Sequence, residues 1–155
     1  MAREVQATLM PDEFSSTPTF EVAGVCVPCN ELGGDYVDQF DLGNGRQALV
    51  VADVCGKGIA ASLLAAALQG ALAAEITQDR PLDQIVSRVN RVHCRLAPIG
   101  KFITFLIAVL ENDGTVRFVN AGHCTPLHVR SHGVGKPQQG GMALGLDEDA
   151  TYETG

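Results

Sequence analysis

The chain has 155 residues, of which 46% are hydrophobic and 19% are charged, a composition typical of a soluble globular domain. A chain of this length buries about 68–70% of the surface that its unfolded form exposes, so we expect one domain with one core. The net charge is −7 and no cluster of lysines or arginines is present in the sequence. Nucleic acid and anionic membranes are therefore disfavoured as partners.

The sequence predicts no targeting signal and no membrane span. The most apolar stretch, residues 59–74, is shorter than a bilayer span and is interrupted by Ser62, Gln69 and Gly70. The first ten residues contain an arginine and a glutamate with no apolar core behind them, unlike a secretory signal. We therefore expect a cytoplasmic protein.

Five cysteines cannot all pair within one chain. Cys26 and Cys29 form a Cys-x-x-Cys pair, and the dipeptides at 93–94 and 123–124 each add a histidine and a cysteine that zinc could use. A structural zinc site joins two close-spaced pairs through a short knuckle, whereas this pair contains Pro28 and falls in a predicted strand. We favour reduced thiols over a zinc-bound structural domain.

The first predicted element in chain order is a short helix at residues 3–10 that is ended by Pro11 and has the pattern of the end of a longer helix. Residues 14–19 are rich in Ser, Thr and Pro and are predicted as a loop. Residues 20–27 alternate apolar and polar side chains loosely, which predicts a strand.

A hairpin is predicted next, with strands at residues 35–42 and 47–54 joined by residues 43–45. The connection reads Gly-Asn-Gly, and Asn-Gly is the strongest short hairpin signal.

Two helices are predicted after the hairpin. The first, at residues 59–77, is rich in Ala and Leu and is entered through glycines. The second, at residues 82–96, starts at Pro81, where a missing N–H group costs nothing, and Asp79 is its candidate cap. Its apolar side chains recur at helical spacing and predict one buried face: Leu82, Ile85, Val86, Val89, Val92 and Leu96.

Three further strands are predicted at residues 102–110, 115–120 and 126–130, the first two joined by a turn at 111–114. Strands followed by a helix pair and then strands again indicate a layered α+β fold with mostly antiparallel sheets.

The predicted hairpin brings two carboxylates face to face. Pairing around residues 43–45 places residue i opposite residue 88 − i, so that Asp35 lies opposite Asp53. Like charges directly opposed on neighbouring strands destabilise a hairpin, and a divalent cation is the usual counter-charge. An all-oxygen setting favours Mg²⁺ or Mn²⁺. The alternative is that Asp35 is a turn residue and Asp53 caps the following helix.

The step Gly56-Lys57-Gly58 into the first helix is not a P-loop. The upstream glycine of that motif is missing, and Lys57 is followed by glycine where the motif has Ser or Thr. Backbone N–H groups at a glycine-rich helix start can still hold an anion, so Gly56, Lys57 and Gly58 are candidate phosphate-binding residues. Lys57 is equally compatible with a solvated loop charge.

Four motifs in order resemble the stage II sporulation protein E branch of the metal-dependent PPM protein phosphatases. They are ELGGDYVDQFDL, ALVVADVCGKGIAASLLAA, TFLIAVLENDGTVRFVNAGHCTPLHVR and GGMALGL. The resemblance implies a layered PPM-type β-sandwich flanked by helices. It implies that Asp35, Asp53 and the backbone carbonyl of Val54 bind metal in a two-metal Mn²⁺ or Mg²⁺ site that activates a water.

The resemblance also implies a substrate and a domain organisation. The family dephosphorylates phosphoserine or phosphothreonine on STAS-type partner proteins in bacterial partner-switching pathways. Residues 1–13 would be the end of an upstream connecting helix and its linker, and residues 14–155 part of the phosphatase domain. A homodimer through the N-terminal helix or through the helix pair at 59–96 is a further expectation.

The chain departs from the family pattern near its end. The later Thr-Asp-Gly and Asp-Asp motifs, which carry the remaining metal-binding aspartates, are absent before Gly155. The acidic residues at 147–149 come too early and are interpreted as solvated turn charges. We therefore expect a domain incomplete at its C-terminus, with a binding module that does not turn over as the alternative to an enzyme. His123 is expected to pack and hydrogen-bond in a loop after a strand, with general-acid chemistry as the alternative.

Overall fold

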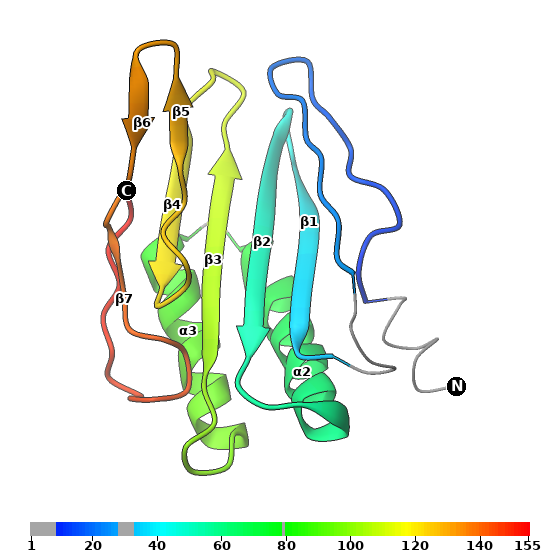
Figure 1. The fold of residues 1–155 in the computed structure, drawn as a ribbon, viewed down its shortest axis with the longest axis vertical. Helices are drawn as coiled ribbons and strands as arrows, with labels where there is room; N and C mark the ends of the chain where they lie inside the picture. The colour runs from blue at the N-terminus through cyan, green and yellow to red at the C-terminus, as the bar shows by residue number, and fades with distance from the viewer. Residues whose placement is uncertain (1–8, 28–32, 79) are drawn as a thin grey trace.

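The computed structural model describes residues 9–27, 33–78 and 80–155. Within these ranges the chain forms a five-stranded sheet, a helix pair and a separate two-stranded ribbon (Figure 1). The elements in chain order are β1 (Asp35–Gly43), β2 (Arg46–Val54), α2 (Gly58–Ile76), α3 (Leu82–Leu96), β3 (Ile103–Leu110), β4 (Val116–Ala121), β5 (His128–Arg130), β6 (Gly133–Gly135) and β7 (Gly140–Gly141).

The strand order in the main sheet is β1-β2-β3-β4-β7, and all neighbours are antiparallel except β4 and β7. Among the described strands, β5 and β6 pair only with each other. The predicted α+β fold with a mostly antiparallel sheet is confirmed, and so are the two predicted helices to within one residue at each end.

The hairpin of β1 and β2 has the predicted register, with Asp35 opposite Asp53. Its turn contains three consecutive residues with positive φ: 73° at Gly43, 55° at Asn44 and 74° at Gly45. Glycine and asparagine are the residues that tolerate this left-handed region, so the Gly-Asn-Gly sequence fixes the turn. The geometry of this turn then determines which residues of the two strands face each other.

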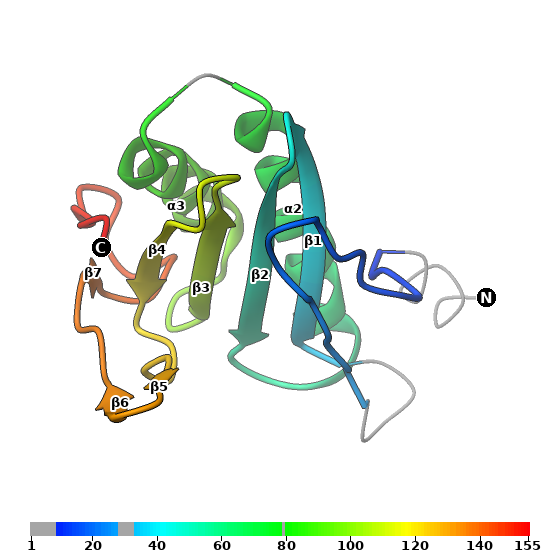
Figure 2. The same cartoon turned by 90° about the horizontal axis from the view of Figure 1, so that it is seen from above.

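Helices α2 and α3 cover one face of the sheet, which is seen edge-on from above in Figure 2. On β2 the side chains that face the helices alternate along the strand and are fully buried: Ala48, Val50, Ala52 and Val54. They pack with Leu68 and Leu72 of α2 and Val86 and Val89 of α3. The intervening residues of β2, including Asp53, belong to the opposite face, which the helices leave open.

Helix α2 has the predicted length, but it is longer than the apolar stretch 59–74, which is expected to be too short for a membrane span. At 19 residues and a mean hydropathy of 1.7, this described helix is long and apolar enough to cross a membrane, so the expectation that the stretch is too short is wrong. Length and composition are weak evidence for a span, since core helices pass the same test. Leu68 and Leu72 are fully buried against the sheet, as in a core helix. The outward side carries exposed Ile59 and Leu63.

The strand predicted at residues 20–27 does not form. This segment pairs with no strand of the described chain, and Val25 and Val27 are 80% and 79% exposed. The preceding loop is attached to β1 by side-chain bonds instead, with the Ser15 N–H donating to Gln39 Oε1 at 2.6 Å. Alternation of apolar residues indicates an extended segment, but it does not show that another strand lies beside it. Without such a neighbour the segment gains no inter-strand hydrogen bonds.

Other predictions fall partly outside the described residues or are shortened. The helix at 3–10 lies almost wholly outside them, and so does its continuity with an upstream element. Asp79, the candidate cap of α3, also lies outside them; the residue at the N-cap of α3 is Pro81, with no side-chain cap bond. The strand predicted at 126–130 is limited to β5, and β7 was not predicted.

His93 of α3 is fully buried, and neither ring nitrogen has a hydrogen-bond partner in the described part of the chain. Burial lowers the pKa of its imidazole from 6.5 to about 4. The folded protein therefore holds a neutral histidine that the unfolded chain would protonate below its ordinary pKa.

We expect the free energy of unfolding to fall as the pH is lowered from 7 to 4, because the unfolded state binds the extra proton in that window. The loss from His93 is at most roughly 3 kcal/mol. Urea unfolding at pH 7 and pH 5 should show a smaller pH dependence in His93→Leu than in the parent. The exposed His132→Leu is the control, and an equal pH dependence in parent and His93→Leu would refute the assignment.

Candidate metal and phosphate site

Two carboxylates stand opposite each other where β1 begins and β2 ends. Asp35 is the first residue of β1, Asp53 is the last but one of β2, and both side chains are exposed on the open face. Residues paired in this way hold their Cβ atoms about 4.5–5.5 Å apart. Within the described residues neither carboxylate has a hydrogen bond or an ion pair. Partial burial and then the charge of Asp35 raise the pKa of Asp53, and nearby His123 lowers it.

Strand β3 adds a polar side chain next to the two aspartates. Thr104 is the cross-strand partner of Asp53, and its hydroxyl shares a hydrogen bond of 2.8 Å with His123 Nδ1. Burial lowers the pKa of His123, while the charges of Asp53 and Asp35 oppose that shift. The imidazole therefore lies within electrostatic reach of both carboxylates.

The loop that carries His123 is closed by one side chain. Asn120 accepts the His123 N–H at 2.7 Å and donates to the His123 carbonyl at 3.1 Å. Gly122 has a φ of 67°, and a Cβ there would lie 2.9 Å from the Ala143 nitrogen. The Asn-Ala-Gly-His sequence thus covers the last two residues of β4 and the tight turn that follows, which confirms the prediction that His123 packs and hydrogen-bonds in a loop after a strand.

The carbonyl of Val54 lies against the glycine that precedes Asp35. The Val54 N–H donates to the Gly34 carbonyl at 3.2 Å, and a Cβ on Gly34 would lie 2.7 Å from the Val54 carbonyl oxygen. Any side chain at position 34 would displace this oxygen. The Gly-Gly-Asp sequence therefore lets a backbone oxygen and two carboxylates come from one short stretch of hairpin.

The glycine loop follows directly after β2. Gly56 and Gly58 have φ values of 120° and 71°, and the Cys55 N–H donates to the Phe102 carbonyl at 2.9 Å. Lys57 occupies the N-cap position of α2 with no side-chain cap bond, so the alternative that Asp53 caps this helix is wrong. A Cβ on Gly56 would lie 2.9 Å from Lys101 Nζ. Two lysines thus flank the loop, in a cavity of about 250 Å³ that both of them line.

The acidic residues at 147–149 do not join the two aspartates. Glu148 pairs with Arg95 at 2.9 Å, and the Asp147 carbonyl accepts a hydrogen bond from Asn90 at 2.7 Å. All three acidic side chains are exposed in a turn that is fastened to α3. Their interpretation as solvated turn charges is confirmed.

The cysteines of the described chain give no support to a zinc site. Burial and the nearby charge of Asp35 raise the pKa of the Cys26 thiol, which disfavours the thiolate that zinc requires. His93 is inaccessible in the core, and Cys29 lies outside the described residues. No group of three or more His, Cys, Asp or Glu side chains in the described ranges is placed to hold a metal.

Two carboxylates and a backbone carbonyl are hard oxygen donors, and this chemistry fits Mg²⁺ or Mn²⁺ rather than a soft metal. They make a partial coordination shell, since either ion takes about six ligands in this setting and usually keeps several waters. Asp35, Asp53 and Val54 therefore stay the predicted metal ligands, and Gly56, Lys57 and Gly58 the predicted phosphate contacts.

Sequence reasoning did not identify Thr104 or Lys101. Thr104 is the one polar residue in the β3 sequence ITFLIAVL, which is a signal that could have been followed. Lys101 precedes β3 and approaches the glycine loop only through the pairing of β2 with β3, a contact between distant parts of the chain.

The family profile described as Stage II sporulation protein E (SpoIIE) matches residues 43–155. Over 156 residues the chain is 24% identical to the phosphoserine phosphatase RsbU of Bacillus subtilis, covering 99% of this chain and 46% of that protein. The chain spans less than half the length of the curated relatives it matches.

Solved structures agree with this grouping. The structure of the RsbU and RsbW domains of Rv1364c from Mycobacterium tuberculosis is similar with a TM-score of 0.69 and 26% identity, over 84% of this chain and 38% of that one. The PPM Ser-Thr phosphatase MsPP of Mycobacterium smegmatis is similar in fold, with a TM-score of 0.61 and 15% identity over 91% of this chain and 73% of that one. The predicted PPM-type fold is confirmed.

Gly34→Ala should displace the Val54 carbonyl oxygen, because the new Cβ would lie 2.7 Å from it. We expect the affinity for Mn²⁺, measured by isothermal calorimetry, to fall about tenfold or more, as for loss of a well-placed ligand. Gly70→Ala is the matched control, since a Cβ at that exposed position of α2 meets nothing within 4 Å. Unchanged Mn²⁺ affinity in folded Gly34→Ala would remove Val54 from the predicted ligand set.

Proposed function

The chain belongs to the Stage II sporulation protein E (SpoIIE) family, and on that premise we propose that it hydrolyses phosphoserine or phosphothreonine on a partner protein. The observation that carries the proposal is the facing pair Asp35 and Asp53, which places two uncompensated carboxylates beside the Val54 carbonyl. A phosphatase that uses two divalent cations needs this kind of oxygen-rich, electrostatically unsatisfied edge.

Each group of residues at the site would have its own role in the reaction. Asp35, Asp53 and the Val54 carbonyl would hold Mg²⁺ or Mn²⁺, which when bound supplies an activated water and charge neutralisation. Lys57 and Lys101 flank the glycine loop, and they would attract a phosphoserine group that carries about −1.5 to −2 charge at neutral pH. His123 would keep the Thr104 hydroxyl oriented beside Asp53.

We further propose that the substrate is a small phosphorylated STAS-type protein of a bacterial, cytoplasmic partner-switching pathway. The support comes from the family and from the similarity to the phosphoserine phosphatase RsbU.

Residues 14–155 would be part of the phosphatase domain and residues 1–13 the end of a connecting helix. The exposed apolar residues Ile59 and Leu63 of α2 support the helix pair as the place of partner binding or homodimerisation.

A second candidate function is a binding module that recognises the partner without turnover. The observation that favours it is that the described residues offer two carboxylates at the site and no third acidic, histidine or cysteine ligand. Partner binding through the helix pair does not depend on a full coordination shell, so such a module would keep recognition and lose hydrolysis.

The test is a phosphoserine peptide assay with Mn²⁺, run on the parent chain, Asp35→Asn and Asp53→Asn. We expect each variant to lose roughly a hundredfold or more in kcat/KM, since each removes a metal-held interaction worth several kcal/mol. Asp113→Asn in the turn between β3 and β4 is the control, because that carboxylate is exposed and the turn follows Leu110, which pairs with Gln47 at the opposite end of β2 from Asp53.

Hydrolysis that survives both aspartate substitutions would contradict the metal assignment. A parent chain that binds Mn²⁺ at Asp35 and Asp53 and binds the peptide, yet shows no turnover, would establish the binding module instead.

A further inference from the structure

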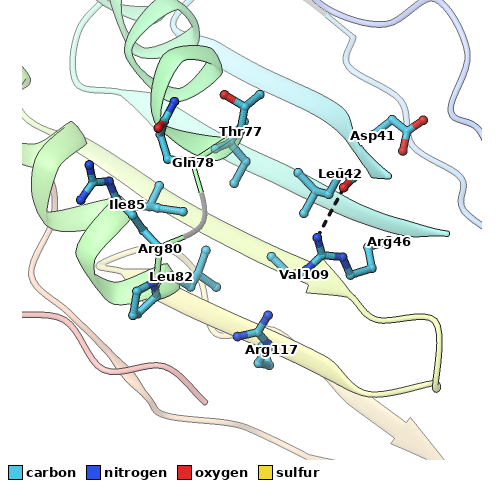
Figure 3. A pocket seen from close by; sticks show the side chains of 12 residues that line it. Asp41, Leu42, Arg46, Thr77, Gln78, Arg80, Leu82, Ile85, Val109 and Arg117 are labelled. Atoms are coloured by element: carbon cyan, nitrogen blue, oxygen red, sulfur yellow. Dashed lines mark hydrogen bonds between the residues drawn. The ribbon is translucent and has the colours of Figure 1, made fainter. Parts of the chain in front are cut away.

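Figure 3 shows the residues that line a second cavity, of about 650 Å³. This cavity lies at the Arg46 end of β2, opposite the end that carries Asp53. It is formed where the turn end of the β1–β2 hairpin meets the connection between α2 and α3. Arg46 and Asp53 stand seven residues apart near the two ends of β2, which separates the two sites by about 23 Å. A volume of this size is typical of a small-molecule site.

The cavity collects positive charge in an acidic protein. Three of the chain's eleven basic residues, Arg46, Arg80 and Arg117, line it, although the net charge of the protein is −7. Among the described residues that line it, Asp41 is the acidic one, and its carboxylate accepts the Gly43 N–H of the hairpin turn at 2.8 Å.

Two of the arginines occupy positions that would otherwise belong to the core. Arg46 is on the face of β2 that carries Ala48 and Val50, and Arg117 is the cross-strand partner of Val109 on β3. This is the face that the helices cover, and it turns from apolar to cationic where the helices end. Figure 3 shows Arg46 and Arg117 on the side of Val109, whereas Arg80 lies on the helix side with its guanidinium group directed away from them.

The arginines retain unused hydrogen-bonding capacity. Arg46 makes one long contact of 3.5 Å to the Leu42 carbonyl and pairs with no carboxylate of the described chain. Arg80 lies 3.8 Å from Glu75, a carboxylate that Arg88 holds more closely at 2.7 Å. Arg117 bonds to one oxygen of Glu111 through Nε and Nη2. A guanidinium has five N–H donors, so each of the three can still bind an oxyanion.

The rest of the lining is mixed. Thr77 and Gln78 are polar, and Val109, Leu82 and Ile85 form an apolar floor that is at most 4% exposed. The apolar surface that a ligand can reach comes from half-buried Leu42 and exposed Pro81 at the edge of this floor. Free inorganic phosphate would leave that surface uncovered, whereas an anion with an apolar body would pair its charge with the arginines and cover it.

We propose that this cavity binds a small organic phosphate, with Arg46 and Arg117 holding the phosphate group and with Leu42 and Pro81 holding its apolar body above the floor of Leu82, Ile85 and Val109. The site is separate from the predicted metal site and does not depend on phosphatase activity. A guanidinium forms paired hydrogen bonds with phosphate oxygens. These bonds are stronger with a phosphate dianion than with a single carboxylate.

The test is an NMR titration of the metal-free full chain in EDTA with two probes, phenylphosphonate and methylphosphonate, which share the charged group and differ in apolar body. We expect saturable shifts of the Leu82, Ile85 and Val109 methyl signals, with phenylphosphonate binding several-fold more tightly. Arg46→Gln and Arg117→Gln should each weaken binding about tenfold or more, as for loss of a charge-assisted hydrogen bond. Arg91→Gln, an exposed α3 arginine outside the cavity, is the control.

Three results would overturn the proposal: no saturable shift, shifts confined to Gly56–Gly58, or unchanged affinity in folded Arg46→Gln and Arg117→Gln. Equal binding of the two probes would remove the apolar body from the proposal and so contradict it as stated. If a variant fails to fold, the shift map of the parent chain alone decides where the probe binds.

Discussion

The opposition of Asp35 and Asp53 across the β1–β2 hairpin is the constraint on which the rest of the site depends. Opposed carboxylates on neighbouring strands cost stability, and a one-residue slip would separate them and turn the apolar side chains away from the helices. Ala48, Val50 and Ala52 are fully buried in the observed register, so the core holds the strands in the position that keeps the charges together. Core packing therefore stabilises an arrangement that electrostatics alone would disfavour.

The neighbouring features follow from this register. Gly34 is needed because the Val54 carbonyl oxygen lies against it, and this oxygen comes one residue after Asp53. Thr104 stands next to Asp53 because β3 pairs with β2, and it connects the site to His123. The glycine loop then leads straight from β2 into α2, so the candidate phosphate contacts are continuous in sequence with the metal ligands. The same strand carries Arg46 near its other end, which places the arginine cavity at a fixed distance from the aspartates.

The predictable parts are those encoded by local sequence. Gly-Asn-Gly sets the turn, the turn sets the register, and the register pairs the aspartates, so half of the candidate site could be derived from one stretch of chain. Thr104 is visible in the sequence as the single polar residue of β3, but its place beside Asp53 and that of Lys101 beside the glycine loop could not be derived, because both depend on β2–β3 pairing between distant parts of the chain. The segment 20–27 has the period of a strand and no partner in the described chain. The arginine cavity escaped notice because Arg46, Arg80 and Arg117 are scattered in the sequence and meet only in the fold.

The central claim is that the hairpin holds a carboxylate pair that is destabilising alone and stabilising with a divalent cation. Urea unfolding of the parent chain and of Asp53→Asn, with and without Mn²⁺, tests it most directly. Without metal, Asp53→Asn should be more stable by roughly 0.2–1 kcal/mol, since it removes a partly screened repulsion. With Mn²⁺ at about a hundred times its Kd, the parent should gain about 2.7 kcal/mol and the order should reverse. A variant that is less stable without metal, or an equal gain from Mn²⁺ in both proteins, would contradict the account.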